Sequence, residues 1–201
     1  QCSQIMDAKN IPLLQALLQV RYRNQLHYPG LALVPYGEAL ARFSPFATQL
    51  IAESLGKPAP QHADHATIIT APIILSGMGP NAQHSFFQQL HQATPVTPVD
   101  FIIVQPNSPN QTHMLQQVVG QMATLAESDR PSTCTVLTQG NARSLGALIA
   151  AYENRVMFES FLLGINAFDQ PGVERGKQVT NAILNGEHAL AKEIFTGMLN
   201  A

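Results

Sequence analysis

The amino-acid sequence predicts an α/β fold, a three-layer sandwich in which a mostly parallel sheet carries helices on both of its faces. Short apolar runs rich in β-branched residues alternate along the chain with longer segments of helical periodicity. This alternation is typical of successive βαβ units, in which a helix returns the chain to the next parallel strand. Residues 99–104 form the clearest apolar run, as expected for a strand that is buried on both faces of a parallel sheet.

The first part of the chain is expected to supply two helices and two strands. Leucines at helical spacing predict an amphipathic helix over residues 11–27, which Tyr28-Pro29-Gly30 ends. The apolar residues 31–35 predict a short buried strand, and a second helix is expected over 37–55. A proline-containing polar loop separates this helix from the apolar run 68–75, which has the length of a strand.

The second part continues the same alternation. After a glycine-containing turn, the expected helices span residues 82–93, 110–127, 142–163 and 172–199. Besides residues 99–104, a further strand is expected at 133–137. The last helix contains Asn185-Gly186, a pair that favours a turn, so a break is expected there. No internal repeat and no low-complexity segment interrupts this order.

Composition and charge exclude several classes of protein. The chain has 201 residues, of which 45% are hydrophobic and 12% charged, a length and balance that fit one globular domain. The formal net charge of −2, without a basic cluster, argues against a nucleic-acid partner. The sequence has neither a run of about 18 apolar residues nor a signal peptide, so we expect no membrane association.

Three further features concern the cellular compartment of the chain, its partners and its relation to a longer protein. Cys2 and Cys134 form neither a metal-binding nor a redox spacing, and a cytoplasmic, thiol-reduced protein is the simplest interpretation. The low density of charged residues suggests that part of the surface is covered by another domain or subunit. The chain begins with Gln1 rather than methionine, which suggests a fragment or a processed piece of a longer protein.

Three short motifs carry the candidate chemistry: Glu53-Ser54-Leu55-Gly56-Lys57, Gln83-His84-Ser85-Phe86 and Phe168-Asp169-Gln170-Pro171-Gly172-Val173-Glu174-Arg175-Gly176-Lys177. Together they resemble the C-terminal half of the glucose-6-phosphate isomerase (phosphoglucose isomerase) family. The segments Tyr36 to Phe43 and Leu145 to Glu153 extend the resemblance over nearly the whole chain. Animal members of the family have tryptophan at the place of Pro171, whereas bacterial members often have proline. This similarity favours a bacterial source.

Glu53 stands at the end of the second expected helix. Taken alone, it is a solvated helix-terminal carboxylate beside a glycine cap, although a negative charge at this end opposes the helix dipole. The resemblance implies instead that Glu53 is the base that moves a proton between C1 and C2 of the sugar. A carboxylate suits this role because it can take and return one proton.

His84 is expected just inside the start of a helix, where a lone histidine is commonly a polar first-turn residue. The resemblance implies that His84 helps to open the pyranose ring and reaches the site of the neighbouring subunit, which implies a homodimer. Imidazole fits ring opening because it moves protons near neutral pH. Ala82 stands where the family commonly has glycine, so the shape of the local loop is left open.

Lys177 closes the longest of the three motifs, and taken alone it is a surface residue of an amphipathic helix. The resemblance implies that its ammonium acts at the ring oxygen of the substrate and that Gln170 contacts the substrate. Gly172 would let the chain pass close to the sugar. Asp169 and Glu174 are interpreted as turn and helix N-terminal carboxylates, which the helix dipole favours.

We expect neither a metal nor another cofactor. The remaining histidines lack the spacing of metal ligands, and His62 and His65, three residues apart in a proline-flanked loop, come nearest to it.

The resemblance also implies a sugar-isomerase (SIS-type) fold, of which the family has two copies. The first copy supplies a Ser/Thr loop for the substrate phosphate and a Gly-Gly-Arg segment that stabilises the enediolate, and neither occurs in this sequence. We therefore expect residues 1–201 to be the single C-terminal SIS-type domain of a two-domain enzyme. Without the missing N-terminal domain it should be nearly inactive, since fixed positive charge at a developing oxyanion is usually a large catalytic contribution.

The sequence thus predicts part of an aldose–ketose isomerase that interconverts glucose 6-phosphate and fructose 6-phosphate through a cis-enediolate, in glycolysis and gluconeogenesis. The alternative is a regulatory SIS module that binds a sugar phosphate without catalysis. The joint presence of Glu53, His84 and Lys177 favours the enzyme, because a sensor does not need this set.

Overall fold

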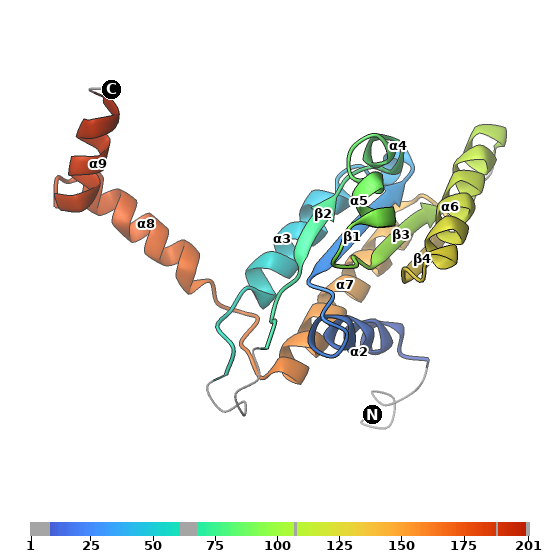
Figure 1. The fold of residues 1–201 in the computed structure, drawn as a ribbon, viewed down its shortest axis with the longest axis horizontal. Coiled ribbons are helices and arrows are strands. Elements are labelled where there is room, and N and C mark those ends of the chain that lie inside the picture. The colour runs from blue at the N-terminus through green and yellow to red at the C-terminus, as the bar shows by residue number, and fades with distance from the viewer. Residues whose placement is uncertain (1–8, 61–67, 107, 188, 200–201) are drawn as a thin grey trace. The chain divides into compact units, whose positions relative to one another are not determined.

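Four parallel strands form the central sheet of the first of two units of the chain (Figure 1). The computed structural model describes residues 9–60, 68–106, 108–187 and 189–199, so Cys2, His62 and His65 lie outside the described residues. The strands are β1 (Gly30–Tyr36), β2 (Ile73–Ser76), β3 (Val99–Val104) and β4 (Ser132–Leu137), in the order β2-β1-β3-β4. All three strand pairs are parallel, which confirms the expected α/β class.

The helices of this unit connect the strands in the expected alternation. They are α2 (Ile11–Asn24), the 3-10 turn η1 (Glu38–Leu40), α3 (Phe43–Leu55), α4 (Gly79–Gln83), α5 (Phe87–Gln92), α6 (Pro109–Glu127) and α7 (Ala142–Leu163). β2 is shorter than the expected strand over 68–75, because Pro72 cannot donate a ladder hydrogen bond and the strand begins after it.

The helix expected over 82–93 is interrupted, with α4 and α5 on either side of a short turn. The reason lies in the packing of Ala82 and Phe87, both of which are buried against the same face of the sheet. In one continuous helix, residues five apart point about 140° away from each other, so both side chains could not face the sheet. The turn allows both of them to pack.

Two hydrophobic cores flank the sheet and make the three-layer sandwich. Alternate residues of β1 point to opposite faces: Leu31 and Leu33 belong to one core, Ala32 and Val34 to the other. The first core lies under α3 and α7, and the second under α4, α5 and α6. The chain thus places the Glu53 helix and the His84 turn on opposite faces of the sheet.

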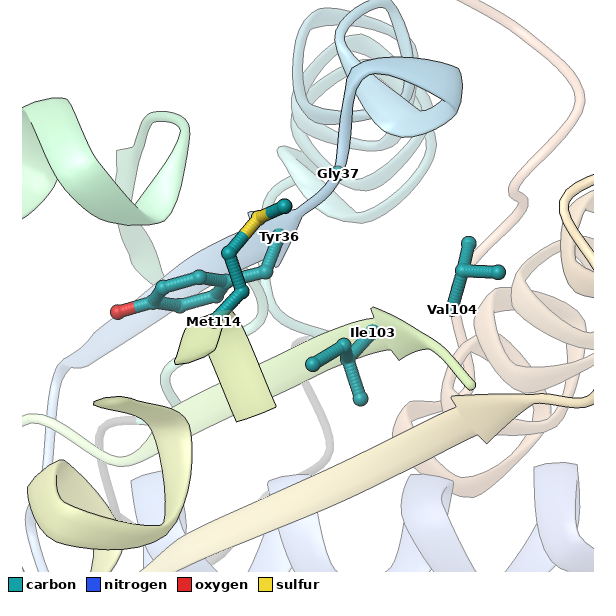
Figure 2. Close-up of a pocket in the computed structure, with 5 residues that line it drawn as sticks. All are labelled: Tyr36, Gly37, Ile103, Val104 and Met114. Carbon is teal, nitrogen blue, oxygen red and sulfur yellow. The ribbon is translucent and has the colours of Figure 1, made fainter. Parts of the chain in front are cut away.

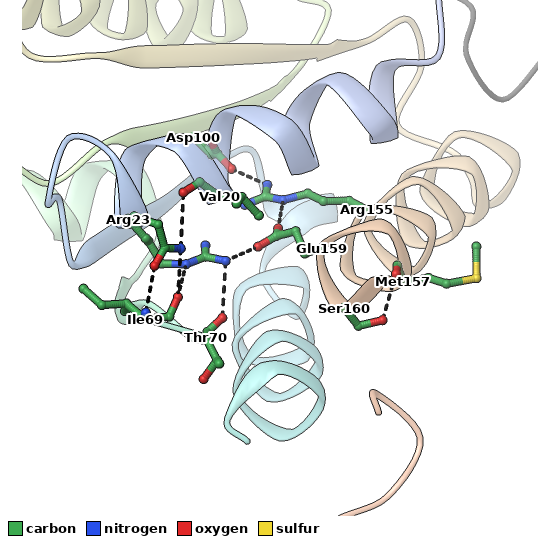
Figure 3. A network of polar contacts seen from close by, with 10 residues as sticks. Val20, Arg23, Ile69, Thr70, Asp100, Arg155, Met157, Glu159 and Ser160 are labelled. Atoms are coloured by element: carbon green, nitrogen blue, oxygen red, sulfur yellow. Dashed lines mark hydrogen bonds and ion pairs between the residues drawn. The ribbon is translucent and has the colours of Figure 1, made fainter. Parts of the chain in front are cut away.

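A buried ionic network joins α2, α7 and β3 (Figure 3). Arg23 pairs with Glu159 at 2.6 Å, and Arg155 pairs with Asp100 at 2.6 Å and with Glu159 at 3.1 Å. Desolvation lowers the pKa of Arg155, but attraction to Asp100 and Glu159 outweighs it, so the pKa is raised above its ordinary value. The two positive and two negative charges compensate one another in a site that excludes water.

The second unit comprises residues 168–201, and its described part consists of α8 (Pro171–Leu184) and α9 (Ala189–Leu199). The break expected at Asn185-Gly186 is confirmed, since Gly186 has a positive φ of 74° between the two helices. No residue of α8 is buried. The assignment of residues 1–201 to a single SIS-type domain stays a prediction.

Candidate functional site

The last turn of α3 holds Glu53 in a half-buried position. Its Oε1 accepts a hydrogen bond from Nε2 of Gln49, one turn earlier, at 3.2 Å. The helix ends at Gly56, whose N–H donates to the carbonyl of Ala52 at 3.0 Å. A Cβ at position 56 would lie 2.4 Å from that carbonyl oxygen, so the motif requires glycine after Leu55.

Lys57 caps the carbonyl end of α3. Its ammonium donates to the carbonyl oxygens of Glu53 and, at 3.3 Å, of Ser54. A cation at a helix C-terminus is favourable because it faces the negative end of the dipole. The sequence contains a signal for this role, since Lys57 follows Glu53 by about one helical turn, but no role was predicted for Lys57.

His84 is exposed and forms the C-cap of α4, so its expected place in the first turn of a helix is wrong. The helix begins earlier than expected, at Gly79, where a Cβ would lie 2.1 Å from the ring of Tyr36 and only glycine fits. Gln83, just before His84, donates to the hydroxyl of Tyr36 at 3.1 Å. Tyr36 is the last residue of β1, so His84 lies near the carboxyl edge of the sheet.

Glu53 lies toward the opposite edge. The carbonyl of Lys57 accepts a hydrogen bond from the hydroxyl of Thr70 at 2.8 Å, and Thr70 precedes Ile73, the partner of Gly30 at the start of β1. The seven residues of β1 span about 20 Å at roughly 3.3 Å per residue. Because the two residues also belong to helices on opposite faces of the sheet, the first unit does not bring Glu53 and His84 of one chain together.

Gln170 and Lys177 lie on the second unit. Gln170 is the N-cap residue of α8 and is exposed, and Lys177 follows it by seven residues, which places both on one side of the helix. Nζ of Lys177 lies 3.6 Å from Oε1 of Glu174, in an ion pair whose side chains are 68% and 63% exposed. Glu174 stands in the first turn of α8, as expected.

A small pocket lies at the carboxyl ends of β1 and β3, between which the strand order reverses direction (Figure 2). Ligands of open α/β sheets commonly bind at such a point. The lining residues are Tyr36, Gly37, Ile103, Val104 and Met114. Its volume of about 20 Å³ holds roughly one water molecule, too little for a sugar phosphate.

The described residues contain no group of three or more His, Cys, Asp or Glu side chains that would hold a metal ion. In the same part of the chain, no helix is both long enough and apolar enough to cross a membrane.

Comparison with known proteins places these motifs in one family. The family model for phosphoglucose isomerase matches residues 3–127 and 121–194. The glucose-6-phosphate isomerase of Protochlamydia amoebophila is 37% identical over 199 residues, which are 88% of this chain and 37% of the relative. That of Treponema pallidum is 37% identical over 201 residues, 89% of this chain and 38% of the relative.

Solved structures agree with this comparison. A crystal structure of a glucose-6-phosphate isomerase from Chlamydia trachomatis has a TM-score of 0.82 and 34% identity, over 94% of this chain and 41% of that one. A hypothetical protein from Thermus thermophilus, 24% identical with a TM-score of 0.73 over 86% of this chain and 45% of its own, shares the fold. The chain spans less than half the length of each of these proteins. By its sequence match and its parallel sheet, this chain belongs to the phosphoglucose isomerase family.

Proposed function

We propose that this chain is the C-terminal domain of an enzyme that interconverts glucose 6-phosphate and fructose 6-phosphate, a cytoplasmic step of glycolysis and gluconeogenesis. The observation that carries the proposal is the family match, whose two segments include Glu53, His84, Gln170 and Lys177. The half-buried position of Glu53 in a capped helix end supports a role as proton carrier, because such a carboxylate is both accessible and held in place.

In the proposed reaction, His84 and Lys177 open the pyranose ring, the imidazole by moving a proton and the ammonium by acting at the ring oxygen. The Glu53 carboxylate then removes the proton from C2 of the open aldose, which leaves a cis-enediolate. The carboxylic acid returns that proton to C1 while the hydroxyl proton of O2 moves to O1, which gives the ketose. Gln170 positions the sugar, and oxidation of one carbon balances reduction of its neighbour, so no external redox partner is needed.

The positions of Glu53 and His84 support a site that is completed by a second chain. The two residues of one chain lie on opposite faces and near opposite edges of the sheet, so they serve different substrate molecules. In a homodimer with twofold symmetry, Glu53 of each chain can share a site with His84 of the other chain. The exposure of His84 fits such a role.

The remainder of the relatives' length is proposed to hold the anchor for the substrate phosphate and the arginine that faces the enediolate. This chain covers 37% to 38% of the two curated relatives, and it lacks both motifs. Without the anchor the substrate is not held in a reactive pose, and without the arginine the developing charge meets only Lys177. We therefore expect this chain by itself to be nearly inactive.

The test is a coupled isomerase assay on a full-length protein that contains this chain. Glu53→Gln keeps the shape of the side chain but removes the base, so kcat should fall at least ~10²-fold while the sugar phosphate still binds. The matched control is Glu153→Gln, the same change at an exposed position of α7, which should leave kcat within about twofold. Retention of most of the rate in Glu53→Gln would remove Glu53 from the mechanism.

The same assay separates the enzyme from a regulatory sugar-phosphate sensor. A sensor would bind the sugar phosphate and turn nothing over in the full-length protein. The enzyme turns it over, and it loses this activity when Glu53 is replaced.

A further inference from the structure

A chain of hydrogen bonds starts at the helix end that carries Glu53. The ammonium of Lys57 donates to the carbonyl oxygens of Glu53 and Ser54, so this side chain folds back over the last turn of α3. The carbonyl oxygen of Lys57 in turn accepts a hydrogen bond from the hydroxyl of Thr70 at 2.8 Å. Lys57 therefore connects the helix end on one side with the segment before β2 on the other.

Thr70 continues the chain into the interior (Figure 3). Its carbonyl oxygen accepts a hydrogen bond from Nη2 of Arg23 at 3.3 Å, and the same guanidinium bonds to the carbonyl of Ile69 at 3.4 Å. Arg23 pairs with Glu159 at 2.6 Å, and both side chains are only 1% exposed. The segment that holds Lys57 is thus fixed to the buried ionic network, whose members cannot move without leaving buried charges unpaired.

This connection stabilises the end of α3, where the charge of Glu53 is unfavourable. A carboxylate in the last turn of a helix faces the negative end of the dipole, and helix ends fray readily because their last carbonyls lack intrahelical partners. Lys57 supplies both a positive charge and two hydrogen bonds at this place. Its ammonium donates to backbone carbonyls of α3, as expected of a lysine that caps a helix end.

We propose that Lys57 and Thr70 are positioning residues for Glu53. The proposal rests on the proposed function, in which Glu53 carries the proton. Thr70 holds the backbone of Lys57, Lys57 holds the last turn of α3, and the turn sets the distance between the carboxylate and the sugar carbons. A displacement of about 1 Å at a reacting group can cost as much as 10²-fold in rate, so loosening this turn should lower the rate of proton transfer.

The experiment uses three threonine variants of a full-length protein that contains this chain. Thr70→Val removes the hydroxyl and keeps the shape of the side chain, so kcat should fall about 10-fold or more while KM stays within about twofold. Thr70→Ser restores the hydroxyl and should recover kcat to within about threefold of wild type. The matched control is Thr48→Val on α3, which removes a hydroxyl that bonds to Ser76 at 3.1 Å and should leave kcat within about twofold.

Lys57→Met provides an independent variant. It keeps most of the aliphatic side chain but loses the ammonium, and we expect the same loss of kcat with little change in KM. If kcat is unchanged in Thr70→Val and Lys57→Met, the positioning role is wrong. The role is also wrong if Thr70→Ser fails to recover kcat, or if Thr48→Val lowers kcat as much as Thr70→Val does.

Glu53→Gln separates failure of this proposal from failure of the proposed function. Loss of activity in Glu53→Gln together with full activity in Thr70→Val overturns the positioning role alone. Full activity in Glu53→Gln overturns the role of Glu53 itself, and the positioning role with it.

Discussion

Gly56 illustrates how one residue sets the end of the helix that carries Glu53. The sequence predicted a glycine cap at this place, for which a left-handed backbone is the usual reason. The structure gives a different reason, since φ is −70° and the constraint is the 2.4 Å approach of a Cβ to the carbonyl of Ala52. Such a close approach depends on the actual path of the chain and is not visible in a residue pattern.

Gly56→Ala should therefore destabilise the protein, because the carbonyl group of Ala52 cannot move away from the new methyl group without disturbing the helix. We expect a loss of roughly 1–3 kcal/mol in the free energy of unfolding, the range of overpacking substitutions. The matched control is Gly146→Ala in α7, where no atom outside the neighbouring helix backbone lies within 4 Å of the new Cβ. That change should stabilise the protein by about 0.5–1 kcal/mol. Urea unfolding of both variants measures the difference, and equal effects would contradict the clash at Gly56.

The identities of the candidate site residues were readable from the sequence, but their surroundings were not. Glu53, Gln170 and Lys177 were found through their motifs, and their roles stay predictions. His84 was expected at a helix start and lies at a helix end, because α4 begins at Gly79, below the ring of Tyr36. That contact joins residues far apart in the sequence, which local periodicity cannot report.

At the scale of the elements, the sequence predicted the bounds of those helices and strands whose packing is uniform along their length. β3 and α7 have the expected bounds, because β3 is buried over nearly its whole length and α7 is buried along one face. The expected helix over 37–55 was wrong in its first turns, where Gly37 has a φ of 111° and a 3-10 turn precedes α3. Glycine conformation decided this boundary, and helical periodicity gave no sign of it.

The buried ionic network is the main polar contact among α2, β3 and α7. Among the described residues, Glu159→Gln leaves the two guanidinium groups of Arg23 and Arg155 with Asp100 as their one negative partner. Removal of one member of a buried charge set costs about 3–5 kcal/mol, since the remaining charge is buried and unpaired. Chemical denaturation should show this loss, and the exposed Glu153→Gln should stay within about 0.5 kcal/mol. A loss below about 1 kcal/mol in Glu159→Gln would contradict the account of the network.

Tyr152, which lies beside this network, makes the free energy of unfolding depend on pH. Desolvation, together with the charge of Asp100, raises the pKa of the Tyr152 phenol above its ordinary value of 10.0, which the phenol keeps in the unfolded chain. Above about pH 10 the unfolded state therefore releases a proton that the folded state retains, so stability falls as pH rises; below pH 10 the phenol contributes no slope. Tyr152→Phe should unfold with a weaker pH dependence between pH 10 and 11, measured by urea titration at each pH. An unchanged slope would contradict the raised pKa.

At the scale of the whole molecule, exposed apolar side chains agree with the low charge density of the sequence. On α2, Ile11 is 62% exposed and Leu14, on the same face, 42%, and on α9, Met198 is 73% exposed. Apolar helix faces of this kind are normally covered in a complete assembly. We expect the 201-residue chain to self-associate, which light scattering measures, and Ile11→Asn with Leu14→Gln to reduce the association. A monomer at high concentration that binds no hydrophobic dye would contradict this expectation.

The proposed two-chain site is the part of the account that residue patterns alone support least. Local motifs found Glu53 and His84, but only the parallel order of the strands places them near opposite edges and on opposite faces of one sheet. The resemblance implied that His84 reaches the neighbouring subunit, and the geometry supplies a physical reason for it. The central claim is therefore that a working site takes Glu53 from one chain and His84 from another.

Subunit complementation tests this claim most directly. Full-length Glu53→Gln and His84→Gln proteins are each expected to be nearly inactive, since each lacks one group in both sites. In a mixed dimer, one site has lost both groups and the other has kept both. Random exchange of equal amounts makes about half of the dimers mixed, so activity should recover to about a quarter of wild type by the symmetry of the dimer. Mixed dimers as inactive as their parents would contradict the claim, because Glu53 and His84 would then act within one chain.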